Sequence, residues 1–105
     1  MAFSYFSLIY PDLDPQIKLR GIELFWQNQV EITRPYNNGC RAIVKQDNQI
    51  YSVFIGFHRI GSPKQICTCV TYSYDYICDH IIATALKYDQ GSGIDIKALL
   101  VSAPL

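Results

Sequence analysis

Three cysteines and one histidine lie within fourteen residues of this chain, in the order C-x-C, eight residues, C-x-H. They are Cys67, Cys69, Cys78 and His80. Three thiolates and one imidazole suit tetrahedral Zn2+, with Zn–S distances of about 2.3 Å and a Zn–N distance of about 2.0 Å. Because four protein ligands leave no position for water, the pattern predicts a structural zinc ion rather than a catalytic one. The alternatives are reduced cysteines that only pack beside a helix, and a disulfide, for which no oxidising compartment is indicated.

The ligand spacing constrains the elements that carry these side chains. On an extended strand, residues i and i+2 point the same way, so Cys67 and Cys69 at a strand end can both face one ion. The apolar run at residues 81–86 predicts a helix. Since positions i and i+2 do not share a helix face, we expect Cys78 just before the first turn and His80 within it.

The C-x-C, C-x-H spacing resembles the signature of the SWIM zinc-finger family. Residues 20–30 (RGIELFWQNQV) look like the opening of many prokaryotic members, and residues 51–55 (YSVFI) look like the strand before their first ligand pair. The resemblance covers residues 15–88. It departs from the family pattern at Val70, where many members have proline, and at Asp79, where many have a basic residue. The resemblance implies zinc binding together with DNA binding, protein binding or both, in settings that include recombination-linked repair.

Composition favours one folded domain over residues 1–105, with residues 67–80 as its zinc-binding segment, since half of the residues are apolar and 13% are aromatic. Nine basic and nine acidic side chains cancel, so the overall charge offers no support for nucleic-acid binding. The apolar residues 1–10 are too few for a membrane span and lack a basic region, so we expect neither a signal peptide nor membrane contact. Reduced cysteines favour a cytoplasmic location.

The remaining patterns predict an α+β fold with an amino-terminal helix before a small antiparallel sheet of three or four strands. Asp14 as N-cap and Pro15 at the first helical position are typical of a helix start, and we expect this helix to reach Asn28. Gly21 in its interior indicates close approach of another backbone, while Lys18 is expected to face water. The expected strands are residues 30–34, 41–46, 50–60 and 65–67, with an edge strand or arm at 1–11, and the carboxy-terminal helices are expected at 81–90 and 94–101.

The predicted sheet is basic, because five cationic side chains between residues 32 and 66 stand against Asp47 alone. These candidate nucleic-acid-binding residues are Arg34, Arg41, Lys45, Arg59 and Lys64. They either contact DNA phosphates, which would make binding sensitive to salt, or occupy solvent-facing strand positions that only keep the chain soluble. Tyr72, Tyr74 and Tyr76 either stack on a partner or cover the zinc site.

These observations predict a non-enzymatic, zinc-stabilised adaptor that binds a protein partner, with direct DNA binding through the sheet as the alternative. An apolar patch around Trp26, the finger tyrosines or the carboxy-terminal helix would serve the adaptor. No nucleophile–base pair and no phosphate loop is recognisable, and we expect no small-molecule substrate. Cys40 is expected to pack or to be a solvent thiol, and His58 to be an ordinary strand residue.

Overall fold

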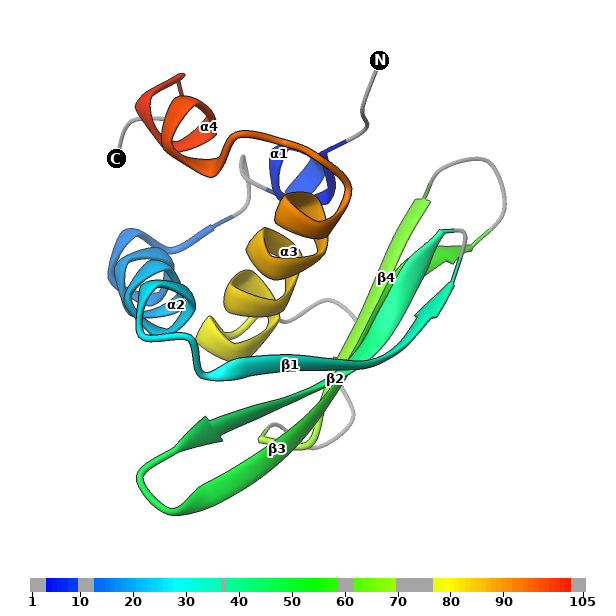
Figure 1. Cartoon of the computed structure of the whole chain (residues 1–105). Helices are drawn as coiled ribbons and strands as arrows, with labels where there is room; N and C mark the ends of the chain where they lie inside the picture. Colours follow the sequence, from blue (N-terminus) through cyan, green and yellow to red (C-terminus); the bar gives the residue numbers. More distant parts are fainter. Residues whose placement is uncertain (1–3, 10–12, 37, 59–61, 70–76, 103–105) are drawn as a thin grey trace.

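The computed structural model describes residues 4–9, 13–36, 38–58, 62–69 and 77–102. Within these residues it forms an antiparallel sheet and helices that gather on one face of it, which confirms the α+β class (Figure 1). The helices are α1 (Tyr5–Ile9), α2 (Pro15–Trp26), α3 (Asp79–Gly91) and α4 (Ile96–Ser102), and the strands are β1 (Val30–Tyr36), β2 (Gly39–Gln46), β3 (Gln49–His58) and β4 (Ser62–Cys67). The sheet has four strands in sequence order, β1-β2-β3-β4. None of the described helices has the length and apolar character needed to cross a membrane.

Helix α3 is the centre of the core. Every side chain from His80 to Leu86 is buried, and α3 contacts all the strands and the other helices described above. Alternate residues of β2 face it, because Ala42 and Val44 are buried while Arg41 is exposed, as the two-residue repeat of a strand requires. The sheet therefore has an inner face under the helices and an outer face that they leave uncovered (Figure 1).

The start of α2 follows from its local sequence. Asp14 is the N-cap, and its carboxylate accepts hydrogen bonds from the backbone N–H groups of Gln16, at 2.9 Å, and Ile17, at 3.3 Å. Pro15 occupies the first helical position, where a missing N–H costs nothing. The predicted helix start is confirmed.

Gly21 of α2 lies close against α3, which confirms the predicted close approach of another backbone. A Cβ atom on this residue would lie 2.6 Å from Cβ and Cγ2 of Ile82 and 2.9 Å from the carbonyl oxygen of Asp79. These neighbours belong to a β-branched side chain and a backbone, which cannot move aside cheaply. The glycine therefore lets α2 lie against the turn of α3 that carries His80.

We expect Gly21→Ala to destabilise the fold by about 1 to 3 kcal/mol, because overpacking at Ile82 outweighs the better helix propensity of alanine. Gly91→Ala is the matched control, since Gly91 also lies in a helix and a Cβ there meets nothing within 4 Å. Urea denaturation of the metal-loaded proteins measures both changes. Equal stability of the two variants would contradict the close helix crossing.

The described part of the amino-terminal segment forms α1 rather than the edge strand that was one of the two expectations, and α1 packs on α3 as an arm over the core. The carboxylate of Asp89 in α3 accepts hydrogen bonds from the backbone N–H of Tyr5, at 2.7 Å, the backbone N–H of Phe6, at 3.0 Å, and the hydroxyl of Ser4, at 2.8 Å. These donors form the first turn of α1, which a helix leaves without internal partners. A five-residue helix is thus held by a side chain distant in sequence.

Lys18 also departs from the sequence-based expectation, because it is only 3% exposed. Its ammonium lies 5.9 Å from the ring centroid of Phe6, and burial lowers the pKa of the group. The apolar stem of a lysine can cover core surface in this way. Glu23 of α2 and Gln27, the C-cap residue of this helix, are exposed as expected.

Candidate metal centre

The ligand atoms of the four predicted metal-binding residues come together in one place. Those of Cys67, Cys69, Cys78 and His80 lie within 4.8 Å of one another, and all of these residues except the half-buried Cys69 are buried. Nδ1 of His80 lies 3.6 Å from Sγ of Cys67 and 3.8 Å from Sγ of Cys78. A tetrahedron with zinc bond lengths has an S···N edge of about 3.5 Å. The spacing and the donor set therefore fit a single metal ion.

The first ligand pair lies where β4 ends. Cys67 is the last residue of β4 and pairs with Val53 of β3. The neighbouring Thr68 exchanges two hydrogen bonds with Ser52, donating its N–H to the carbonyl oxygen and accepting the Ser52 N–H at its hydroxyl, each at 3.0 Å. Cys69 then lies in a turn beyond the strand. The predicted position of the C-x-C pair at a strand end is confirmed, although only its first cysteine is within the strand.

The second ligand pair lies at the start of α3. Cys78 is the N-cap residue in extended conformation, and His80 is in the first turn, as predicted. The sulfur of Cys78 faces the cluster and lies 3.8 Å from Nδ1 of His80. Asp79 instead accepts the backbone N–H of His80 at 3.0 Å, and its negative charge suits a helix amino terminus.

The pKa values of the three clustered thiols are shifted in different directions. The interaction between the Cys67 and Cys78 sulfurs lowers the pKa of Cys78, while the same interaction and burial raise the pKa of Cys67. Burial raises the pKa of Cys69 to about 11. Since metal ligands are thiolates, a metal ion that binds here displaces protons from the sulfurs.

The other nitrogen of His80 has a partner that the sequence-based reasoning missed. Nε2 lies 2.7 Å from Oε1 of Gln46, and the imidazole stacks on Tyr51 with a centroid distance of 4.2 Å and an interplanar angle of 25°. One signal for Gln46 was available, because it follows the inward-facing Ala42 and Val44 at the same two-residue spacing on β2.

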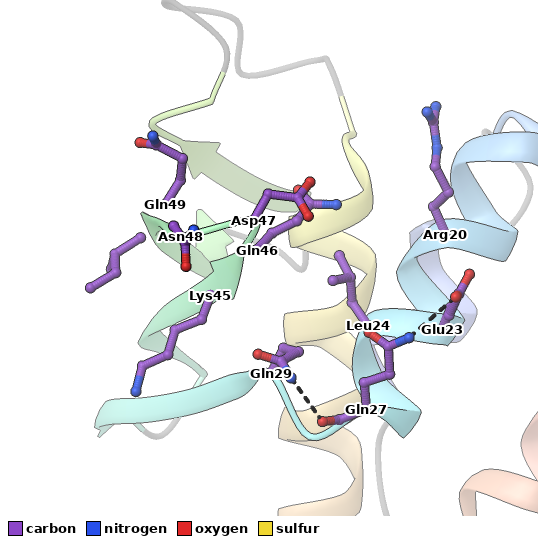
Figure 2. A pocket seen from close by; sticks show the side chains of 11 residues that line it. Arg20, Glu23, Leu24, Gln27, Gln29, Lys45, Gln46, Asp47, Asn48 and Gln49 are labelled. Carbon is purple, nitrogen blue, oxygen red and sulfur yellow. Dashed lines mark hydrogen bonds between the residues drawn. The ribbon is translucent and has the colours of Figure 1, made fainter.

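A groove of about 750 Å³ opens beside this contact, between α2 and the β2–β3 hairpin (Figure 2). Its lining is mostly amide and charged side chains of both signs: Arg20, Glu23, Leu24, Gln27, Gln29, Lys45, Gln46, Asp47, Asn48, Gln49 and Ile50. Gln46 belongs to both places, since it lines the groove and contacts His80. Gln46 therefore connects the candidate metal site to the wall of the groove.

The predicted basic residues are exposed where the structure describes them, and two of them lie together on the outer face. Arg34 of β1 pairs with Arg41 of β2, which pairs with Phe54 of β3. Nε of Arg41 donates to the hydroxyl of Tyr36 at 3.1 Å, and its guanidinium lies 5.7 Å from the Phe54 ring centroid. We call Arg34, Tyr36, Arg41 and Phe54 the outer cluster. Lys45 and Lys64 are exposed on β2 and β4, and Arg59 lies outside the described residues.

The other residues singled out from the sequence have separate positions. Cys40 is fully buried in β2, where burial raises its pKa to about 12, and it is not among the four clustered residues. His58 ends β3, and its side chain is outside the described part of the chain. Trp26 is 51% exposed and packs edge-on against Phe25. The finger residues Tyr72, Tyr74 and Tyr76 and also Val70 lie outside the described residues.

The fold and the cluster together define an α+β domain with a Cys3His group positioned to bind a metal ion. No family model, curated protein or solved structure matches the chain.

Proposed function

We propose that this chain is a SWIM-type zinc-binding domain in which zinc has a structural role. The observation that carries the proposal is the convergence of three cysteine sulfurs and one histidine nitrogen within 4.8 Å. Soft thiolates with one imidazole favour zinc over magnesium, calcium or manganese. A bound ion would supply a cross-link between the end of β4 and the start of α3. The C-x-C, C-x-H spacing that resembles the SWIM family supports the same assignment.

The domain in this proposal is not an enzyme. Cys67, Cys69, Cys78 and His80 provide the complete ligand set of a tetrahedral ion, so none of its positions remains for a nucleophilic water. Since the thiols must stay reduced to bind zinc, the proposed location is the cytoplasm.

The proposed role is that of an adaptor that binds another protein. Helix α2 supports this role, because it exposes two large apolar side chains one heptad apart, Leu19 at 50% and Trp26 at 51%. Ile22 lies half-buried between them on the same helix face. Exposed apolar stripes of this kind mark protein-binding surfaces, and tryptophan is enriched among the residues that dominate binding energy.

Direct DNA binding is the second candidate, and the outer cluster favours it. Arg34 and Arg41 lie over the rings of Tyr36 and Phe54 on a sheet face that none of the described helices covers. Guanidinium groups contact phosphates, and exposed aromatic rings stack on bases. The neutral net charge of the chain gives no further electrostatic attraction.

Elemental analysis of the purified protein tests the zinc assignment. We expect one zinc ion per chain in the wild type and its loss in Cys69→Ser and in His80→Ala. Cys40→Ala is the matched control. Cys40 is also a free cysteine, but it lies outside the four-residue cluster, so its substitution should leave the metal content unchanged. A folded wild-type protein without metal would refute the proposal.

A salt-titrated DNA-binding assay separates the two roles. If the domain binds DNA directly, affinity falls steeply with salt and Arg41→Ala weakens binding, whereas Trp26→Ala does not. If it is an adaptor, DNA binding is absent or insensitive to Arg41→Ala. Capture of a protein partner should then be lost in Trp26→Ala and kept in Arg41→Ala.

A further inference from the structure

The two ring nitrogens of His80 have different surroundings, and this difference selects the metal-binding atom. Nδ1 faces the sulfurs of Cys67 and Cys78 at 3.6 and 3.8 Å, while Nε2 faces the amide oxygen of Gln46 at 2.7 Å. An amide oxygen only accepts hydrogen bonds, so Nε2 carries the proton and donates it. In a neutral imidazole, the lone pair is then on Nδ1.

We propose that Gln46 is the positioning residue that fixes the tautomer of His80 and makes Nδ1 the nitrogen that binds zinc. This inference rests on the proposed zinc assignment and adds the identity of the ligand atom and of the group that orients it. Metal-binding histidines generally donate their second N–H to a protein acceptor, which fixes the ring and increases its basicity. Here the acceptor comes from a residue 34 positions away in sequence.

The β2–β3 hairpin holds the imidazole in both position and plane. Gln46 is near the end of β2, and Tyr51 on β3 pairs with Val44, two residues before Gln46. Tyr51 stacks on the imidazole at 4.2 Å, so the ring plane is set by one strand and its hydrogen bond by the other. A ring flip would remove Nε2 from Gln46 and Nδ1 from the sulfurs at once.

One further polar group lies near Nδ1, the carboxylate of Asp79 at 3.4 Å. The same Oδ1 atom accepts the backbone N–H of His80 at the shorter distance of 3.0 Å. The Gln46 contact is therefore the shortest polar contact of the ring among the described residues. With Nε2 directed at Gln46, Nδ1 faces the cysteine sulfurs.

The position of Gln46 makes the inference testable without disturbing the core. Gln46 is half-buried and lines the groove, and Figure 2 shows its side chain beside the start of α3. Substitution by leucine removes the acceptor at similar size, and substitution by glutamate keeps an acceptor. Gln49→Leu is the matched control, because Gln49 is the cross-strand partner of Gln46 and is exposed.

Zinc affinity is measured by competition with a chromogenic chelator on the full chain. We expect Gln46→Leu to weaken zinc binding about 10- to 100-fold, as for other acceptors of this kind, with Gln46→Glu and Gln49→Leu close to the wild type. Thermal unfolding of each zinc-loaded variant establishes that the affinities belong to folded protein.

Nuclear magnetic resonance of protein loaded with 113Cd and labelled with 15N-histidine identifies the ligand atom directly. We expect coupling of cadmium to Nδ1, with a proton on Nε2 that exchanges slowly in the wild type and in Gln46→Glu and faster in Gln46→Leu. Coupling to Nε2, or unchanged zinc affinity and proton exchange in Gln46→Leu, would overturn the inference while the zinc assignment stands. A wild-type chain that binds neither metal would overturn both.

Discussion

Removal of the proposed zinc ion by a strong chelator will abolish the cooperative thermal unfolding of this domain, and added zinc will restore it. The cluster joins the end of β4 to the start of α3, the helix that contacts every strand. Structural zinc sites contribute about 10 kcal/mol or more of apparent binding free energy, which is as large as the total stability of many domains of this size. Circular dichroism at increasing temperature, with and without the chelator, measures the change.

The control for this experiment is a chelator at the same ionic strength that is already saturated with zinc. It should leave the melting temperature unchanged. The Cys69→Ser variant should show no cooperative unfolding, like the metal-free wild type, and should not respond to zinc. A metal-free protein that unfolds cooperatively at the temperature of the zinc-loaded form would show that the core alone stabilises the fold.

We expect Asp89→Ala to destabilise the fold strongly, although Asp89 lies outside the proposed metal site. Asp89 is fully buried and accepts three hydrogen bonds at the start of α1. Alanine would leave the backbone N–H groups of Tyr5 and Phe6 without their partner, at a cost of about 3 kcal/mol. Ser4→Ala removes only the third bond, so we expect about 1 kcal/mol for it. Urea denaturation of zinc-loaded proteins measures both, and equal losses would contradict this role of Asp89.

Asp89 should also make stability depend on pH, because burial raises the pKa of its carboxyl above the ordinary value of 3.8. Between 3.8 and this raised pKa, the folded chain holds a proton that the unfolded chain has released. The contribution of Asp89 to the free energy of unfolding therefore falls as the pH rises through this interval. Asp89→Asn removes the titration, so the difference between wild type and variant should shrink with rising pH. The pKa of Asp89 can be measured from its carboxyl carbon resonance. A value below 3.8 would reverse the expected direction of the pH dependence.

The features that could be predicted from sequence are those whose signals are local. The metal ligands lie within fourteen residues, so their spacing alone indicated one site. Asp14 and Pro15 are adjacent, and their helix-starting chemistry needs no distant partner. Gly21 was also interpretable, since a glycine inside a helix indicates a close neighbour even when the neighbour itself is unknown.

The features that were missed depend on groups far apart in the chain. Gln46 and His80 are 34 residues apart, and no motif connects them before the sheet and α3 are in contact. The helical state of α1 depends on Asp89. Pro35 and Pro63 fall just outside the strands expected at residues 30–34 and 65–67, but they lie in β1 and β4. Both are edge strands, where a proline need not remove a ladder hydrogen bond.

The capping of α1 by Asp89 has a consequence for the order in which the chain acquires its structure. Tyr5 leaves the ribosome before α3 does, yet the carboxylate that its N–H needs is 84 residues further along the chain. Its hydroxyl also lies 2.9 Å from Oε1 of Gln65, whose strand is likewise made later. A five-residue helix is not stable alone. During synthesis, residues 5–9 should therefore remain unfolded until α3 emerges. The packing of α1 on α3 should then be one of the last steps of folding.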